Sequence, residues 1–73
     1  MENELKKIFA NVFEVGIDEV ENIEYQSVEA WDSIGHMMMI SEVESEFNIS
    51  IEMDDVIVIS NLKECIEVVS KYL

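Results

Sequence analysis

The chain has 73 residues, 49% of them apolar, so it can build one small hydrophobic core but not two. We therefore expect a single domain over residues 1–73. Seventeen Asp and Glu side chains against four lysines give a net charge of −13, which repels nucleic acids and anionic membranes and attracts basic protein surfaces.

Export and membrane insertion find no support in the sequence. The single cysteine, Cys65, cannot form a disulfide within the chain, and the N-terminal residues lack the pattern of a signal peptide. No apolar run approaches the roughly 20 residues that span a bilayer. We expect a monomeric cytoplasmic protein.

The first predicted helix runs from Asn3 to about Val15, and Gly16 can supply the left-handed residue that ends it. Its apolar residues recur at helical spacing: Leu5, Ile8, Phe9, Val12 and Phe13. Residues 16–31 have no sustained period, which predicts a long loop. Its scattered apolar side chains would fasten it to the helices: Ile17, Val20, Ile23, Val28 and Trp31.

The second predicted helix begins at Asp32 or Ser33, ends near Phe47 and is apolar on two faces. One face has the width of a core stripe: His36, Met39, Ile40, Val43 and Phe47. The other combines apolar and polar residues: Ser33, Ile34, Met37, Met38, Ser41, Glu44 and Ser45. Because so small a domain has no second core, we interpret this face as a surface for partners, which methionines suit.

Two further helices complete the predicted fold. Met53–Val58 is predicted as a short helix, because no second strand is available to pair with it. Asn61 and Glu64 form a plausible capping pair for a last helix over Leu62–Tyr72. Its apolar stripe is Leu62, Ile66, Val69 and Leu73. The sequence thus predicts an all-α fold, a small four-helix bundle of three main helices and one short helix, with a long loop after the first.

Catalytic and metal sites are not indicated by the sequence. One histidine and one cysteine cannot form a tetrahedral zinc site, and the acidic runs lack the spacing of an EF-hand. A hydrolase built on Asp32, Ser33 and His36 would also need an oxyanion site and a pocket, which so small a domain does not offer. We expect a protein that is not an enzyme, with no catalytic residue and no metal site.

The excess of carboxylates also predicts a response to pH. Mutual repulsion should raise the pKa of many carboxylates in the folded chain, so that folding favours their protonation. Stability should then increase as the pH falls from 7 toward mild acid.

The stretch Trp31-Asp32-Ser33-Ile34-Gly35-His36-Met37 resembles the Asp-Ser-Leu motif of acyl carrier proteins, in the form with a preceding tryptophan that standalone bacterial carriers often have. Residues 42–47 resemble the acidic second half of the family's second helix. Length, acidity and helix order fit over the whole chain. Ile34 replaces the usual leucine, and Gly35 and Met38 stand where carriers of fatty-acid synthesis often have acidic residues. These departures leave room for a specialised carrier, such as one for polysaccharide modification or a secondary-metabolite pathway, beside a carrier of fatty-acid or polyketide synthesis.

The resemblance implies that a phosphopantetheinyl transferase attaches 4′-phosphopantetheine covalently to Ser33. The arm would carry acyl groups as thioesters to acyl-transferring or acyl-activating enzymes with basic surfaces. We expect those partners to contact Asp32, Ile34, Met37, Met38, Ser41 and Glu44. An alternative stays open, in which the chain is an unmodified acidic helical adaptor that docks through Met37 and Met38, with Ser33 only a helix cap.

Overall fold

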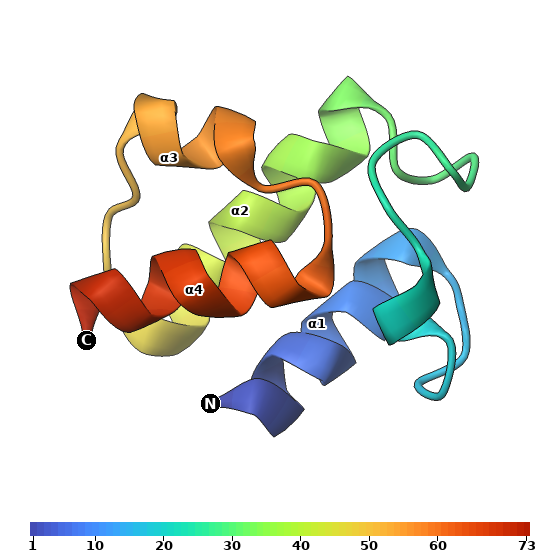
Figure 1. The fold of residues 1–73 in the computed structure, drawn as a ribbon, viewed down its shortest axis with the longest axis horizontal. Helices are drawn as coiled ribbons and strands as arrows, with labels where there is room; N and C mark the ends of the chain where they lie inside the picture. The colour runs from blue at the N-terminus through green and yellow to red at the C-terminus, as the bar shows by residue number, and fades with distance from the viewer.

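The computed structural model describes all 73 residues and contains four α-helices and no β-strand (Figure 1). The helices are α1 (Glu2–Phe13), α2 (Ser33–Phe47), α3 (Met53–Val58) and α4 (Leu62–Tyr72), with a 3₁₀ turn at Val20–Asn22. The predicted all-α class, the four helices and the long first loop are confirmed. No helix has both the length and the apolar composition that crossing a membrane requires.

α2 and α4 begin with the same capping geometry. Asp32 accepts a hydrogen bond from the Gly35 N–H at 2.7 Å, and Asn61 accepts one from the Glu64 N–H at 2.8 Å. Each bond satisfies a backbone donor that has no partner inside the helix. The predicted capping pair of α4 is confirmed in one direction only, because the Glu64 carboxylate accepts from Ser60 rather than from the backbone of Asn61.

α1 ends earlier than the sequence indicates. Its last helical residue is Phe13, and Glu14 rather than Gly16 adopts the left-handed conformation, with φ 58°. The Glu14 N–H still donates to the Ala10 carbonyl, which closes the last turn. The prediction for Gly16 is therefore wrong: the chain leaves the helix at a non-glycine residue, and Gly16 has no positive φ.

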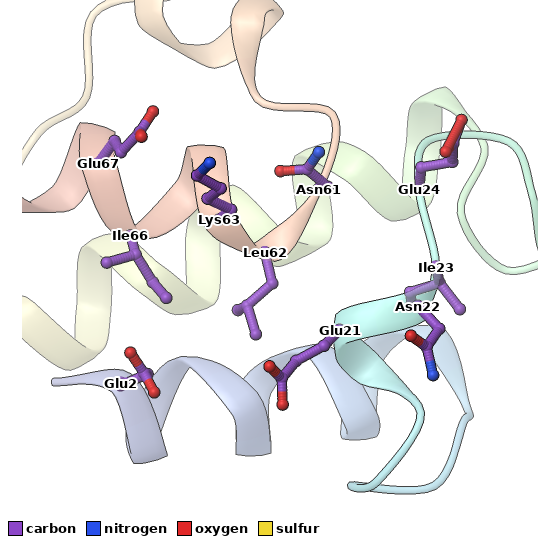
Figure 2. Close-up of a pocket in the computed structure, with 10 residues that line it drawn as sticks. All are labelled: Glu2, Glu21, Asn22, Ile23, Glu24, Asn61, Leu62, Lys63, Ile66 and Glu67. Carbon is purple, nitrogen blue, oxygen red and sulfur yellow. The ribbon is translucent and has the colours of Figure 1, made fainter.

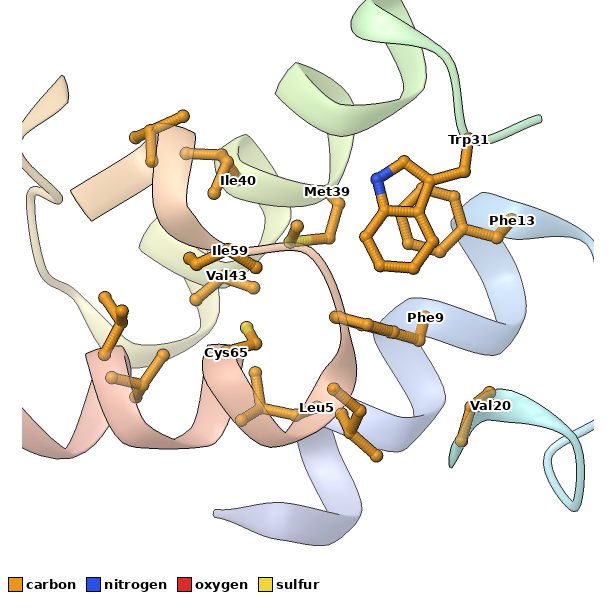
Figure 3. Packing of buried hydrophobic residues seen from close by; sticks show 14 of the residues in the cluster. Leu5, Phe9, Phe13, Val20, Trp31, Met39, Ile40, Val43, Ile59 and Cys65 are labelled. Carbon is orange, nitrogen blue, oxygen red and sulfur yellow. The ribbon is translucent and has the colours of Figure 1, made fainter. Parts of the chain in front are cut away.

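One hydrophobic cluster of 16 buried residues receives side chains from all four helices and from the long loop (Figure 3). The predicted core face of α2 is buried at His36, Met39, Ile40 and Val43, and Phe47 packs at its edge. Two predicted core residues, Ile17 and Leu73, are instead exposed, whereas Val68 is buried without having been predicted.

Trp31 anchors the end of the long loop. Its side chain is fully buried, and its ring stacks on Phe13 of α1 with centroids 4.1 Å apart and planes at 10°. Phe9 meets the same ring edge-on at 5.3 Å. These contacts combine apolar burial with favourable aromatic geometry, and Figure 3 shows the three rings together beside α1. They fix where the chain enters α2.

The short helix α3 is joined to the end of α4 by a polar cluster. Asp55 accepts hydrogen bonds from Lys71 Nζ at 2.7 Å and from the Tyr72 hydroxyl at 2.6 Å. The Tyr72 oxygen accepts in turn from the Glu52 N–H at 3.0 Å. The bond from Lys71, followed by that from Tyr72, lowers the pKa of Asp55 below its usual range. α3 thus has a fixed position although it has only six residues.

Repulsion between like charges does not determine the pKa of those carboxylates that have a specific hydrogen-bond partner. The pKa of Glu4 is lowered chiefly by its hydrogen bond with the N-terminal amine, and that of Glu64 by its bonds with Ser60. With Asp55, these are three carboxylates whose pKa moves down. The expectation of raised pKa values is wrong for them, because a direct hydrogen bond to the ionised form outweighs the field of more distant charges.

Candidate functional site

Ser33 is the first residue of α2 and is exposed to solvent. The capping hydrogen bond of this helix is made by the Asp32 carboxylate. The hydroxyl of Ser33 takes part in none of the hydrogen bonds of the chain and is free to react. Capping therefore accounts for Asp32 but not for Ser33.

The backbone around Ser33 favours an anion at this position. Gly35 N–H is bonded to Asp32 and His36 N–H to the Asp32 carbonyl, so the amides of Ser33 and Ile34 have no helical partner. No acidic residue lies in the first turn of α2. Free amides and the positive end of the helix dipole favour an anion here, and the Asp32 carboxylate at the cap already supplies one negative charge.

His36 joins three segments of the chain beneath this turn. Its Nδ1 accepts a hydrogen bond from Trp31 Nε1 at 3.0 Å, and its Nε2 lies 2.8 Å from the carbonyl oxygen of Val56 in α3. A neutral imidazole with its hydrogen on Nε2 satisfies both contacts. The ring is buried, so both nitrogens serve to hold the loop, α2 and α3 together. The prediction that His36 lies on the core face of α2 is confirmed.

Gly35 allows the long loop to pass close to the start of α2. A Cβ at this position would lie 1.9 Å from the Ala30 carbonyl oxygen, far inside contact distance. Any side chain would therefore push the loop away from the helix. This role could not be predicted from the sequence, because Gly35 has a regular helical conformation and the residue it contacts, Ala30, lies in a loop without a period.

An apolar surface flanks Ser33. On α2, Ile34 is 71% exposed, and Met37 and Met38 are 47% and 55% exposed, as predicted. α3 adds three exposed apolar residues that the sequence analysis did not assign to a surface: Met53, Ile57 and Val58. We call these six residues the α2/α3 apolar surface. They are six of the ten large hydrophobic residues that the chain exposes.

The contact between His36 and Val56 brings the two helices together at this surface. Met37 and Met38 directly follow His36, and Ile57 and Val58 directly follow Val56. The exposed residues of both helices therefore lie within two positions of the junction, except Met53, which is three positions from Val56. A signal for the α3 residues was present in the run Val56–Ile59, which has more apolar residues than one face of a short helix can bury.

The remaining predicted partner residues differ in how freely they are presented. Ser41 is exposed, and Asp32 is exposed while its carboxylate caps α2. Glu44 is half-buried, and its Oε2 accepts a hydrogen bond from the Ile51 N–H at 2.8 Å, which fastens the connection that follows α2. Partner binding stays a prediction for each of the residues proposed from the sequence: Asp32, Ile34, Met37, Met38, Ser41 and Glu44.

Other reactive groups lie away from this site. Cys65 is fully buried, and burial raises its pKa to about 12, so its thiol is neutral and unreactive. No three His, Cys, Asp or Glu side chains converge to hold a metal ion. Neither Cys65 nor a metal centre therefore offers an alternative to Ser33, whose role in covalent chemistry stays a prediction.

The sequence was also compared with known proteins. No protein-family model matches the chain, and no curated protein matches it.

Proposed function

We propose that this chain is an acyl carrier protein. A phosphopantetheinyl transferase would attach 4′-phosphopantetheine to the Ser33 oxygen, and the thiol of the arm would carry acyl groups as thioesters between enzymes. The observation that carries the proposal is an exposed serine hydroxyl with no structural task, placed one residue after the cap of α2 and beside the α2/α3 apolar surface.

In the attachment step, Ser33 Oγ forms a bond to the phosphorus that bears the pantetheine in coenzyme A. The pyrophosphate bond breaks, the nucleotide part leaves as adenosine 3′,5′-bisphosphate, and the serine proton passes to a base of the transferase. The chain itself supplies the hydroxyl and the free amides of the first turn. Because His36 uses both ring nitrogens in structural contacts, the base must come from the transferase.

Partner enzymes would dock on the α2/α3 apolar surface. Their contact surfaces should combine an apolar centre with basic residues around it, because the net charge of the carrier is −13. The arm ends in a thiol that must stay reduced between reactions, which suits a cytoplasmic location. The chain would act as a monomeric substrate of these enzymes and not as a catalyst.

The test is a modification assay. Purified protein is incubated with coenzyme A and a broad-specificity phosphopantetheinyl transferase, and intact mass is measured. We expect a gain of about 340 Da, the mass of one attached arm. Ser33→Ala should gain nothing, whereas Ser41→Ala, which alters another exposed serine of α2, should be modified like the wild type. An unchanged wild-type mass, or a gain in Ser33→Ala, would contradict the proposal.

The adaptor hypothesis remains the second candidate, because the α2/α3 apolar surface could also bind a partner without any arm. Ser33→Asp separates the two. In an adaptor, the N-terminus of α2 tolerates an aspartate at this position, and partner binding persists. In a carrier the same change removes the attachment oxygen and abolishes acyl transfer through the chain.

A further inference from the structure

A groove of about 660 Å³ lies between α1, the 3₁₀ turn and α4 (Figure 2). Its apolar part includes Leu62 and Ile66, whose side chains extend from α4 toward α1. No residue of α2 or α3 lines the groove. A ligand bound there would touch neither Ser33 nor the α2/α3 apolar surface.

Four carboxylates from separate segments surround this groove: Glu2, Glu21, Glu24 and Glu67. In Figure 2 they stand around Leu62 and Ile66 rather than in one cluster. With Lys63 as the one basic lining residue, the groove has a net charge of −3. Lys6 offsets part of this from α1, at 3.3 Å from Glu21 and 3.9 Å from Glu2.

We propose that this groove is a second docking site, which binds an extended basic segment of a partner protein. Cationic side chains of the segment would pair with the surrounding carboxylates, and an apolar side chain between them would rest on Ile66, the one apolar lining residue that is half-buried rather than buried. Glu24 and Glu67 are the strongest candidates for this pairing, because both are exposed and neither has an ion-pair partner within the chain.

Charge and geometry favour this occupant over others. A metal ion would need three or more carboxylates on one point, and no such group exists in the chain. A second copy would bring its own net charge of −13 and only four lysines, of which Lys6 and Lys71 already pair with carboxylates of their own chain. The positive charges of an extended basic segment are separated from one another, and so are the four carboxylates around the groove. Each charge of the segment can therefore pair with a different carboxylate.

The inference does not depend on modification of Ser33, and its test uses the unmodified chain. The probe is an acetylated octapeptide of alternating leucine and arginine, titrated into ¹⁵N-labelled protein at about 0.15 M salt. We expect saturable shifts of the amides of residues 21–24 and 61–67. An absence of saturable binding, or shifts centred on α2, would overturn the proposal.

Two double variants separate the groove from the general negative charge. Glu24→Gln with Glu67→Gln removes two charges at the groove, and should weaken peptide binding about fivefold, as expected for two exposed ion pairs. Glu42→Gln with Glu46→Gln removes two exposed charges of α2, and should weaken peptide binding less than about twofold. Equal losses in the two variants would overturn the proposal. Ser33→Ala should bind the peptide like the wild type, and a loss there would contradict an independent site.

Discussion

α2 and α4 start with the same type of capping hydrogen bond, made by Asp32 and by Asn61. The residues that follow the cap differ between the two helices. The residue after the cap is buried Leu62 in α4 and exposed Ser33 in α2. Two positions later, α4 has Glu64, whose side chain reaches back to Ser60, and α2 has Gly35, which has no room for a side chain. The residues at the start of α4 are thus explained by packing and capping, and α2 departs from this pattern where the proposed attachment site lies.

The outer faces of the two helices differ in the same way. Within α4, the exposed positions are polar or charged: Lys63, Glu67, Ser70 and Lys71. In α2, three exposed positions of the first two turns are large and apolar: Ile34, Met37 and Met38. Packing requires none of these three residues. The surplus of apolar side chains on α2 is therefore the observation that favours this helix as the contact surface for the proposed acyl-transfer partners.

The comparison is most directly tested by two adjacent methionines. Met39 is fully buried and Met38 is 55% exposed. Met39→Ala should lower the free energy of unfolding by about 2–5 kcal/mol, because it leaves a cavity in the core. Met38→Ala should change it by less than about 0.5 kcal/mol. Urea unfolding followed by circular dichroism measures both.

Partner binding should rank the same two variants in the opposite order. Met38→Ala should weaken binding of any partner that uses the α2/α3 apolar surface while the fold stays intact. If Met39→Ala is already unfolded without urea, its loss in the free energy of unfolding lies at the upper end of the predicted range. Equal effects of the two substitutions on unfolding would show that α2 has no division into a core face and a partner face.

Gly35→Ala is the second test. Helix propensity alone predicts that alanine stabilises α2 by about 1 kcal/mol. The added Cβ would lie 1.9 Å from the Ala30 carbonyl oxygen, and displacing that backbone should cost about 1–3 kcal/mol. We therefore expect a net loss of stability, measured as a lower urea midpoint.

The corresponding change in α4 is Glu64→Ala, which removes the bonds to Ser60 but introduces no clash. It should destabilise the chain less than Gly35→Ala. If Gly35→Ala instead raised the urea midpoint, the loop at Ala30 would have to be free to move away from α2.

The sequence predicted those parts of the fold that depend on local signals. The limits of α2, α3 and α4 follow from hydrophobic period and from Asx caps, both of which act within a few residues. It failed where the deciding contact is made by the backbone. Whether α1 ends at Glu14 or Gly16 depends on which residue turns left-handed, and the position of Ala30 against Gly35 depends on how the whole loop packs.

The candidate site was predictable to a similar degree. Ser33, Ile34, Met37 and Met38 were identified from a motif and from the absence of a second core. The contribution of Ile57 was missed, because a six-residue helix is too short for its period to distinguish a buried from an exposed face. The groove between α1 and α4 joins residues about 65 positions apart, and no local pattern connects them.

The smallest predicted effect concerns Glu64 of α4, because the equivalent position in α2 is Gly35, which has no side chain. Bonds from the Ser60 hydroxyl and N–H lower the pKa of Glu64 below its ordinary value of 4.5. Because the folded pKa is the lower one, the contribution to stability is present above pH 4.5 and is lost as the pH falls through the folded pKa.

Glu64→Gln removes the charge and keeps an oxygen acceptor, so it should lower the melting temperature at neutral pH, and this deficit should shrink as the pH falls through the folded pKa of Glu64, which is below 4.5. Thermal unfolding of both proteins across this range measures the difference. Asn61 caps the same helix through an uncharged side chain, so the deficit of Asn61→Ala should not shrink toward acid. A deficit of Glu64→Gln that persisted at low pH would mean that Glu64 stabilises the start of α4 through packing and neutral hydrogen bonding rather than through its charge.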